Sequence, residues 1–116
     1  MTNLPPDPTP VPSAITAFQA AHDRRDTATA LPLFTADATV VDDGRTYVGI
    51  VEVETFLSTA ASEYTYTRSL LAAEEAAPDR WLITNRLQGN FPGGQVDLTY
   101  EFRLADGLIA SLTIAP

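Results

Sequence analysis

The sequence contains no cysteine and no lysine, and it has a single histidine, His22. Without cysteine there is no disulfide, no thiolate nucleophile and no zinc–sulfur site. The absence of lysine excludes Schiff-base chemistry and the lysine of a phosphate-binding loop. One histidine cannot form a multi-histidine metal centre. We therefore expect neither a metal nor a cofactor.

Basic residues are scarce as well. Seven of them stand against 15 acidic residues, which gives a formal net charge of -8. Nucleic-acid binding needs a basic surface that displaces phosphate counterions, so this class of partner is excluded. No segment approaches the ~20 apolar residues of a membrane-spanning helix, and no charged start with an apolar run indicates a signal peptide. We expect a cytoplasmic protein without a membrane partner.

The length of 116 residues fits a single domain with an ordinary share of hydrophobic residues, 45%. Residues 1–12 include five prolines, which predicts an extended, disordered tail. The alternative interpretation of this tail is a proline-rich ligand for a partner. Residues 13–116 then form the one folded domain.

Helical spacing of apolar residues predicts a first helix from the N-cap Ser13 to about Arg24. Asp26 is the expected N-cap of a second helix over residues 27–34, which Pro32 shortens or kinks.

Strand patterns dominate the rest of the chain. A hairpin over residues 38–48, with its turn at Asp43-Gly44, precedes a third helix over residues 50–61. Four long antiparallel strands are then expected, over residues 64–72, 80–90, 96–104 and 108–114. Helices first and strands after predict an α+β fold, with the three helices packed on the concave face of a curved antiparallel sheet.

Several phrases carry a resemblance to a known family: Leu33-Phe34-Thr-Ala-Asp-Ala-Thr-Val-Val-Asp, Tyr47-Val-Gly-Ile, Phe91-Pro-Gly-Gly-Gln-Val-Asp-Leu-Thr-Tyr-Glu-Phe-Arg-Leu and Asp106-Gly-Leu-Ile-Ala-Ser-Leu-Thr-Ile. With the order of elements, they resemble the SnoaL-like branch of the nuclear-transport-factor-2-like superfamily over residues 13–116. The resemblance implies a cone-shaped sheet around one apolar cavity, often in a homodimer. Its members include isomerases, cyclases, dehydratases, epoxide hydrolases and non-catalytic binding proteins, so activity has to be argued from the cavity.

Asp42 is the first candidate for chemistry in that cavity. It shares a strand face with Ala38 and Val40, so it points into the cone if they do. Apolar walls raise the pKa of a carboxyl group, which suits a general base. The ketosteroid isomerases, which this chain resembles here, have their base after a similar Ala-Thr-Val phrase. The alternative is that Asp42 opens the turn with Asp43 and faces water.

The rest of the isomerase pattern is incomplete. The position that matches that family's helical tyrosine is Phe18, which has no hydrogen-bond donor, and the late-strand aspartate matches Tyr100, which has one. Losing one donor to an oxyanion typically lowers the rate by ~10²–10³. This argues against a steroid isomerase and leaves Tyr100 as the expected donor.

Two further residues have competing interpretations. Arg86 lies in a phrase that resembles the epoxide hydrolases, but Gln88 replaces their carboxylate, which argues against that activity. Arg86 is a candidate ligand for an anionic or carbonyl group, or else a surface or dimer-face residue. His22, near a helix end, is a capping or dipole group, or a proton shuttle at the cavity rim.

We therefore expect a cavity that holds a small hydrophobic molecule, with Asp42 as base and Tyr100 as hydrogen-bond donor in a cofactor-independent isomerase, cyclase or dehydratase. The expected ligand-binding residues are Phe18, Phe34, Val40, Phe56, Leu98 and Arg86. The alternative is a non-catalytic ligand-binding or dimeric interaction module.

Overall fold

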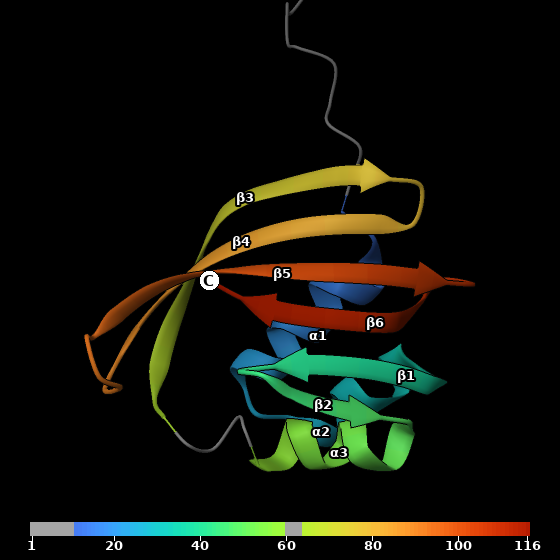
Figure 1. The fold of residues 1–116 in the computed structure, drawn as a ribbon, viewed down its shortest axis with the longest axis horizontal. Helices are drawn as coiled ribbons and strands as arrows, with labels where there is room; N and C mark the ends of the chain where they lie inside the picture. The colour runs from blue at the N-terminus through green and yellow to red at the C-terminus, as the bar shows by residue number, and fades with distance from the viewer. Residues whose placement is uncertain (1–10, 60–63) are drawn as a thin grey trace, which may run out of the picture.

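The computed structural model describes residues 11–59 and 64–116 (Figure 1). Its elements are α1 (Ser13–Asp23), α2 (Thr27–Ala30), the 3-10 turn η1 (Leu31–Leu33), β1 (Phe34–Asp42), β2 (Arg45–Val48), α3 (Ile50–Thr59), β3 (Tyr66–Ala77), β4 (Arg80–Gly89), β5 (Gln95–Ala105) and β6 (Leu108–Ala115). Most of the expected tail and the end of the expected third helix lie outside the described residues. None of the described helices is long and apolar enough to cross a membrane.

The six strands form one sheet in the order β2-β1-β6-β5-β4-β3. Neighbouring strands are antiparallel except β1 and β6, which pair in parallel. Figure 1 shows α1 behind β5 and β6, and the ends of β3 and β4 curling away from the flat part of the sheet. The predicted α+β fold is confirmed, with one parallel pair that the sequence pattern did not indicate.

The N-terminal helices differ from the prediction at their ends. Ser13 is the first residue of α1 and not its cap, which is Pro12 and makes no side-chain bond. Asp26 does cap α2, because its carboxylate accepts the backbone N–H of Thr29 at 3.1 Å. The helix expected up to Phe34 stops at Ala30, and Phe34 is extended, with φ -103° and ψ 151°.

Proline chemistry accounts for this early stop. Pro32 lies in η1 and has no N–H with which to continue an α-helical ladder. The chain therefore tightens into one 3-10 turn and enters β1 four residues before the expected strand at Ala38. At the other side of the sheet, β3 runs on to Ala77 and not to residue 72, up to the turn at Pro78.

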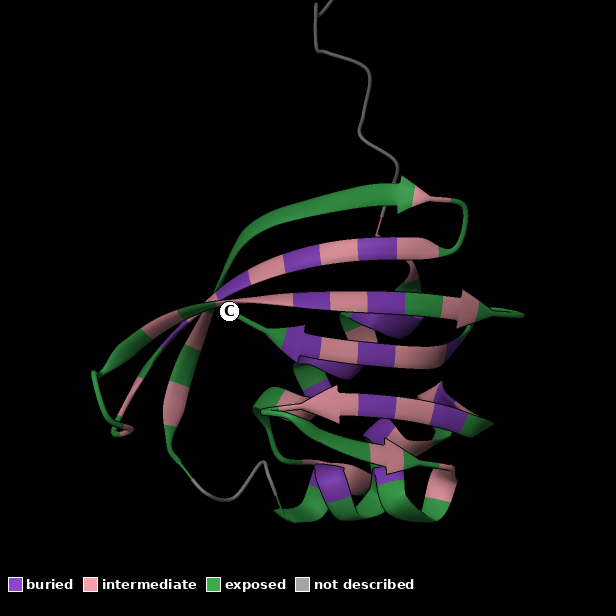
Figure 2. Cartoon of the chain, in the orientation of Figure 1, coloured by how far each residue is buried: buried purple, intermediate pink, exposed green. Residues whose placement is uncertain are grey.

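The core lies between the helices and the sheet. Phe18 of α1, Phe56 of α3 and Phe102 of β5 are among its largest fully buried side chains. Phe18 packs edge-on against Phe34 and Phe102, with ring centroids 5.5 and 5.7 Å apart. Figure 2 shows buried residues alternating along β4, β5 and β6, whereas β3 is exposed along most of its length. One face of the sheet thus carries the core.

A buried polar network joins α1 to β3 and β4. Asn85, fully buried, donates to Gln19 Oε1 at 2.7 Å and accepts from Arg68 Nη1 at 3.2 Å. Arg68 in turn makes a two-pronged ion pair with Asp23 at 2.9 Å. Since a buried polar group without a partner is costly, the network fixes the helix on the sheet. Among the described residues, no buried side-chain nitrogen or oxygen lacks a hydrogen-bond partner.

We predict that Asn85→Ala lowers the free energy of unfolding by about 1–3 kcal/mol, because it leaves the buried amide of Gln19 without its partner. Urea unfolding followed by circular dichroism measures the change. Gln88→Ala, on an exposed residue of the same strand, is the matched control and should shift the free energy by no more than about 0.5 kcal/mol. Equal effects of the two substitutions would contradict a stabilising network.

Candidate functional site

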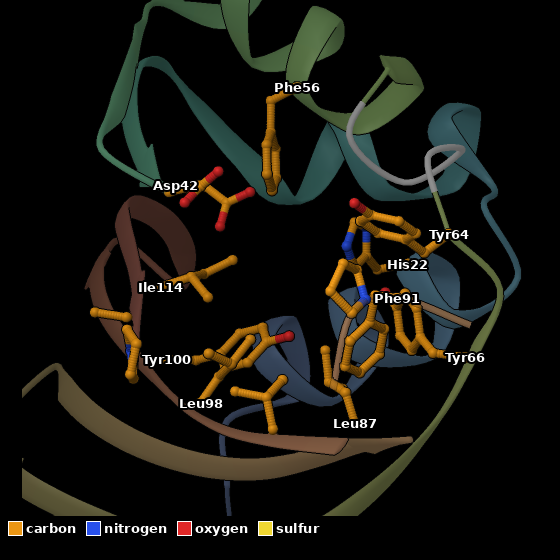
Figure 3. Close-up of a pocket in the computed structure, with 15 residues that line it drawn as sticks. His22, Asp42, Phe56, Tyr64, Tyr66, Leu87, Phe91, Leu98, Tyr100 and Ile114 are labelled. Carbon is orange, nitrogen blue, oxygen red and sulfur yellow. The ribbon is translucent and has the colours of Figure 1, made fainter. Parts of the chain in front are cut away.

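The concave side of the sheet holds a cavity of about 330 Å³, partly open to solvent (Figure 3). It lies between the end of α1, α3, the end of β1 and strands β3 to β6. The residues that line it are His22, Asp42, Asp43, Phe56, Tyr64, Tyr66, Leu87, Phe91, Pro92, Val96, Leu98, Tyr100, Ile114, Ala115 and Pro116. Aromatic and aliphatic side chains form most of this wall.

Asp42 and Tyr100 both line the cavity, on one row across three neighbouring strands. Asp42 of β1 pairs with Ile114 of β6, which pairs with Tyr100 of β5. Residues paired in this way point to the same face of a sheet, and two strand spacings separate their backbones by about 10 Å. In Figure 3 the hydroxyl of Tyr100 points into the open space on whose other side Asp42 lies.

The turn after β1 explains why Asp42 faces the cavity. Asp43 and Gly44 take the left-handed positions of the turn, with φ 53° and 76°. Asp42 can therefore remain in the strand, on the face that it shares with the fully buried Ala38 and Val40. Asp42 therefore does not open the turn toward water, which was the alternative interpretation of this residue.

Tyr100 is held in its protonated form. Its side chain is almost fully buried, and burial raises the pKa of its hydroxyl far above the usual 10. The neighbouring Tyr66 and the carboxylate of Asp42 raise it further. Burial also raises the pKa of Tyr66, another tyrosine of this wall. A tyrosine hydroxyl is protonated at neutral pH already at its ordinary pKa of about 10, so both can donate hydrogen bonds, and burial keeps them protonated to still higher pH.

His22 lines the cavity from the last turn of α1. Its ring stacks between those of Phe18 and Phe56, at centroid distances of 5.2 and 5.7 Å. Burial lowers the pKa of this imidazole, and the opposing charge of Asp23 only partly offsets the effect. A neutral ring interacts weakly with the helix dipole. His22 therefore fits the role of a cavity-wall residue better than that of a charged group that caps α1.

The expected wall residues divide into two groups. Phe56 and Leu98 line the cavity, whereas Phe18, Phe34 and Val40 lie in the core and are absent from its wall. The rings of His22, Phe34 and Phe102 cover Phe18, so it lies one layer behind the cavity surface. Alternation along a strand indicates which face a residue takes, but not how deeply it lies within that face.

Arg86 lies on the opposite face of the sheet. The neighbours that flank it in β4, Asn85 and Leu87, are buried, so the alternation turns Arg86 outward. There its Nε donates to Asp97 Oδ1 at 2.8 Å, with side chains 40% and 44% exposed. Arg86 therefore forms an ion pair on the outer face and does not line the cavity, so the expectation that it binds a ligand inside the cone is wrong.

Several lining residues were not singled out from the sequence: Tyr64, Tyr66, Leu87, Phe91 and Ile114. Their aromatic and aliphatic character fits core packing equally well. The signal that could have found Tyr66 and Ile114 is strand register, which depends on pairing and not on local pattern. Within residues 11–59 and 64–116, no three His, Cys, Asp or Glu side chains gather as metal ligands would.

Comparison with solved structures identifies the family. A candidate polyketide cyclase from Sinorhizobium meliloti is 30% identical, with 90% of this chain and 95% of that chain covered and a TM-score of 0.84. The chain belongs to the SnoaL-like branch of the nuclear-transport-factor-2-like superfamily.

More distant structures share the fold of this SnoaL-like chain. The Δ5-3-ketosteroid isomerase of a Mycobacterium species has 20% identity, 90% coverage of both chains and a TM-score of 0.73. A Mycobacterium tuberculosis protein in complex with estradiol-17β-hemisuccinate has 20% identity, 89% and 90% coverage and the same TM-score, 0.73. No family model and no curated protein matches the chain.

We predict that His22 titrates below the ordinary value of 6.5. It is the single histidine, so its ring proton is directly identifiable in a proton NMR titration. Because the unfolded state binds the proton more readily, stability should fall as the pH drops below 6.5 toward the folded-state pKa, and be insensitive to this group above 6.5. A measured pKa at or above 6.5 would contradict the buried, neutral ring.

Proposed function

We propose that this SnoaL-like protein binds a small hydrophobic molecule in its cavity and catalyses a cofactor-independent proton transfer on it, as in an isomerisation, cyclisation or dehydration. The observation that carries the proposal is the row that sets Asp42 and Tyr100 on one cavity wall. The likeness to a candidate polyketide cyclase supports it, as does the steroid ester bound by a protein of the same fold.

In this proposal Asp42 is the general base. In a β,γ-unsaturated ketone, its carboxylate takes a proton from the carbon next to the carbonyl group; the electron pair of that C–H bond forms a C=C bond, and the π pair of the carbonyl group moves to the oxygen. The Tyr100 hydroxyl donates a hydrogen bond to the enolate oxygen as charge develops there. Asp42 then returns the proton to the γ-carbon of the dienolate, the C=C pair there forms the new C–H bond and the oxygen pair re-forms the carbonyl group, so that the conjugated isomer leaves with the atoms of the substrate.

Tyr66 is the second donor that we assign to this site. It lines the same cavity, and its proximity to Tyr100 raises the pKa of the Tyr100 hydroxyl. Phe18, which matches the donor of the ketosteroid isomerases, lies in the core and has no hydroxyl. Tyr66 therefore offers the hydrogen bond that Phe18 cannot make, from a strand and not from the first helix.

The second candidate function is a non-catalytic ligand-binding or dimeric interaction module. Phe18 favours it, because the isomerase pattern requires a donor where the chain has an apolar ring. We also propose that two copies associate as a homodimer. Exposed leucines on β3 support this, since Leu70 is 55% and Leu71 45% exposed. The cytoplasmic location stays a prediction from the sequence.

Proton abstraction can be tested before the substrate is known. We predict that the protein accelerates exchange of the α-hydrogens of 2-tetralone, a compact neutral ketone, with D₂O. Asp42→Asn should reduce the exchange to the buffer rate, and Tyr100→Phe should slow it by about 10²–10³-fold. Mass spectrometry of the recovered ketone measures deuterium uptake.

The matched control is Asp97→Asn, which removes a carboxylate from the outer face and should leave the exchange rate unchanged. Binding of 2-tetralone is measured in parallel by NMR titration. A wild-type protein that binds the ketone and exchanges it no faster than Asp42→Asn would contradict the catalytic proposal and favour the non-catalytic module.

We predict from the homodimer proposal a mass of twice 12.5 kDa in sedimentation equilibrium at micromolar concentration. Leu70→Glu combined with Leu71→Glu should shift the mass toward the monomer, because each carboxylate would have to be desolvated in the contact. A monomeric wild type at all concentrations would contradict the dimer.

A further inference from the structure

Two side-chain carboxyl groups line the cavity, and no arginine is among the described residues that line it. Asp42 and Asp43 line it, and His22 is the one lining residue among the described ones that can become positive, yet its burial favours the neutral form. Two nearby cations are engaged elsewhere, since Arg68 is paired with Asp23 and Arg25 donates to the backbone oxygen of Tyr64. Arg45, which pairs with Asp42 across the hairpin, is exposed and does not line the cavity. The cavity is therefore a poor site for an anionic ligand.

The wall facing these acids is aromatic. Figure 3 shows Phe56, Tyr64, Phe91 and Tyr100 around the open space, contributed by α3, the chain before β3, the turn after β4 and β5. Tyr64 and Phe91 meet edge to face, with centroids 5.9 Å apart and planes at 68°. The faces of aromatic rings carry partial negative charge and attract organic cations.

We propose that the ligand carries a compact organic cation, a tertiary or quaternary ammonium group, on an apolar body, and that the aromatic wall and Asp42 together select it. Aromatic rings would surround the cation on several sides, and the carboxyl groups of Asp42 and Asp43 line the same cavity, a combination that a neutral lipid-like ligand would leave unused. Ammonium groups have a weakly hydrated apolar surface when alkylated, so they enter such a cavity at little cost in desolvation.

The inference rests on the proposed ligand-binding function, and it is compatible with proton transfer. A positive charge on the ligand stabilises an enolate that forms beside it, so it assists the same step that Tyr100 assists. It also predicts the order of affinities: cation first, neutral isostere second, anion last, because a carboxylate would face Asp42 and Asp43.

A matched set of probes tests this order: benzyltrimethylammonium, its isostere neopentylbenzene, in which carbon replaces the charged nitrogen, and phenylacetate. We expect NMR titrations to give the ammonium probe an affinity on the order of tenfold higher than its isostere, with phenylacetate weakest. Asp42→Asn and Phe91→Leu should each lower the affinity for the ammonium probe several-fold and change the affinity for the isostere less. Asp97→Asn should change neither.

Equal or tighter binding of neopentylbenzene, or ammonium binding that is indifferent to both Asp42→Asn and Phe91→Leu, would overturn the inference. The titration with 2-tetralone keeps this failure distinct from failure of the proposed function. If the ketone and the isostere bind but the ammonium probe does not, the ligand class is wrong and the binding cavity stands. If none of the probes binds, both proposals fail.

Discussion

The parallel pairing of β1 with β6 is the constraint on which the candidate site depends. It places Asp42 beside Ile114 and, through the antiparallel partner β5, in line with Tyr100. A slip of one residue in this pairing would turn the carboxylate to the outer face of the sheet. The buried residues Ala38 and Val40 of the same strand fix this register, because the same slip would also turn them out of the core.

The electrostatic state of the cavity follows from burial more than from charge partners. Burial is the largest cause of both shifts, since it raises the pKa of Tyr100 and lowers the pKa of His22 by removing solvent from their charged forms. The cavity thus combines hydrogen-bond donors with acids at one rim and an otherwise apolar wall. This combination suits a base that works beside donors, and it also suits a ligand held without any chemistry; turnover decides between the two.

The sequence predicted the fold for sound physical reasons and left two interpretations of Asp42 open, of which the structure fits the one that faces the cavity. Period-2 alternation indicates strand faces, and an aspartate-glycine pair indicates a tight turn, so the strand before Asp43 could be placed correctly. The resemblance supplied the cone-shaped sheet around one cavity, but not the order of its strands or the parallel pairing of β1 with β6. The expectation failed at Phe34, where Pro32 ends the helix sooner than the apolar spacing implied.

A local sequence pattern does not show how deeply a side chain lies behind the cavity surface, nor which residues from distant segments reach that surface. Phe18 and Val40 were expected in the cavity wall, but covering rings and strands place them in the core. His22, Tyr66 and Ile114 reach the cavity through packing of α1, β3 and β6. Arg86 was a candidate ligand because of the phrase that resembles the epoxide hydrolases, whereas the alternation of β4, with Asn85 and Leu87 buried, turns it to the outer face.

A crystal structure of the protein with bound 2-tetralone tests the central claim most directly. The account predicts the ketone inside the cavity, with its oxygen about 3 Å from the Tyr100 hydroxyl and its α-carbon facing the Asp42 carboxylate. A cavity filled by the protein's own side chains, or a ketone bound away from Asp42 and Tyr100, would contradict it.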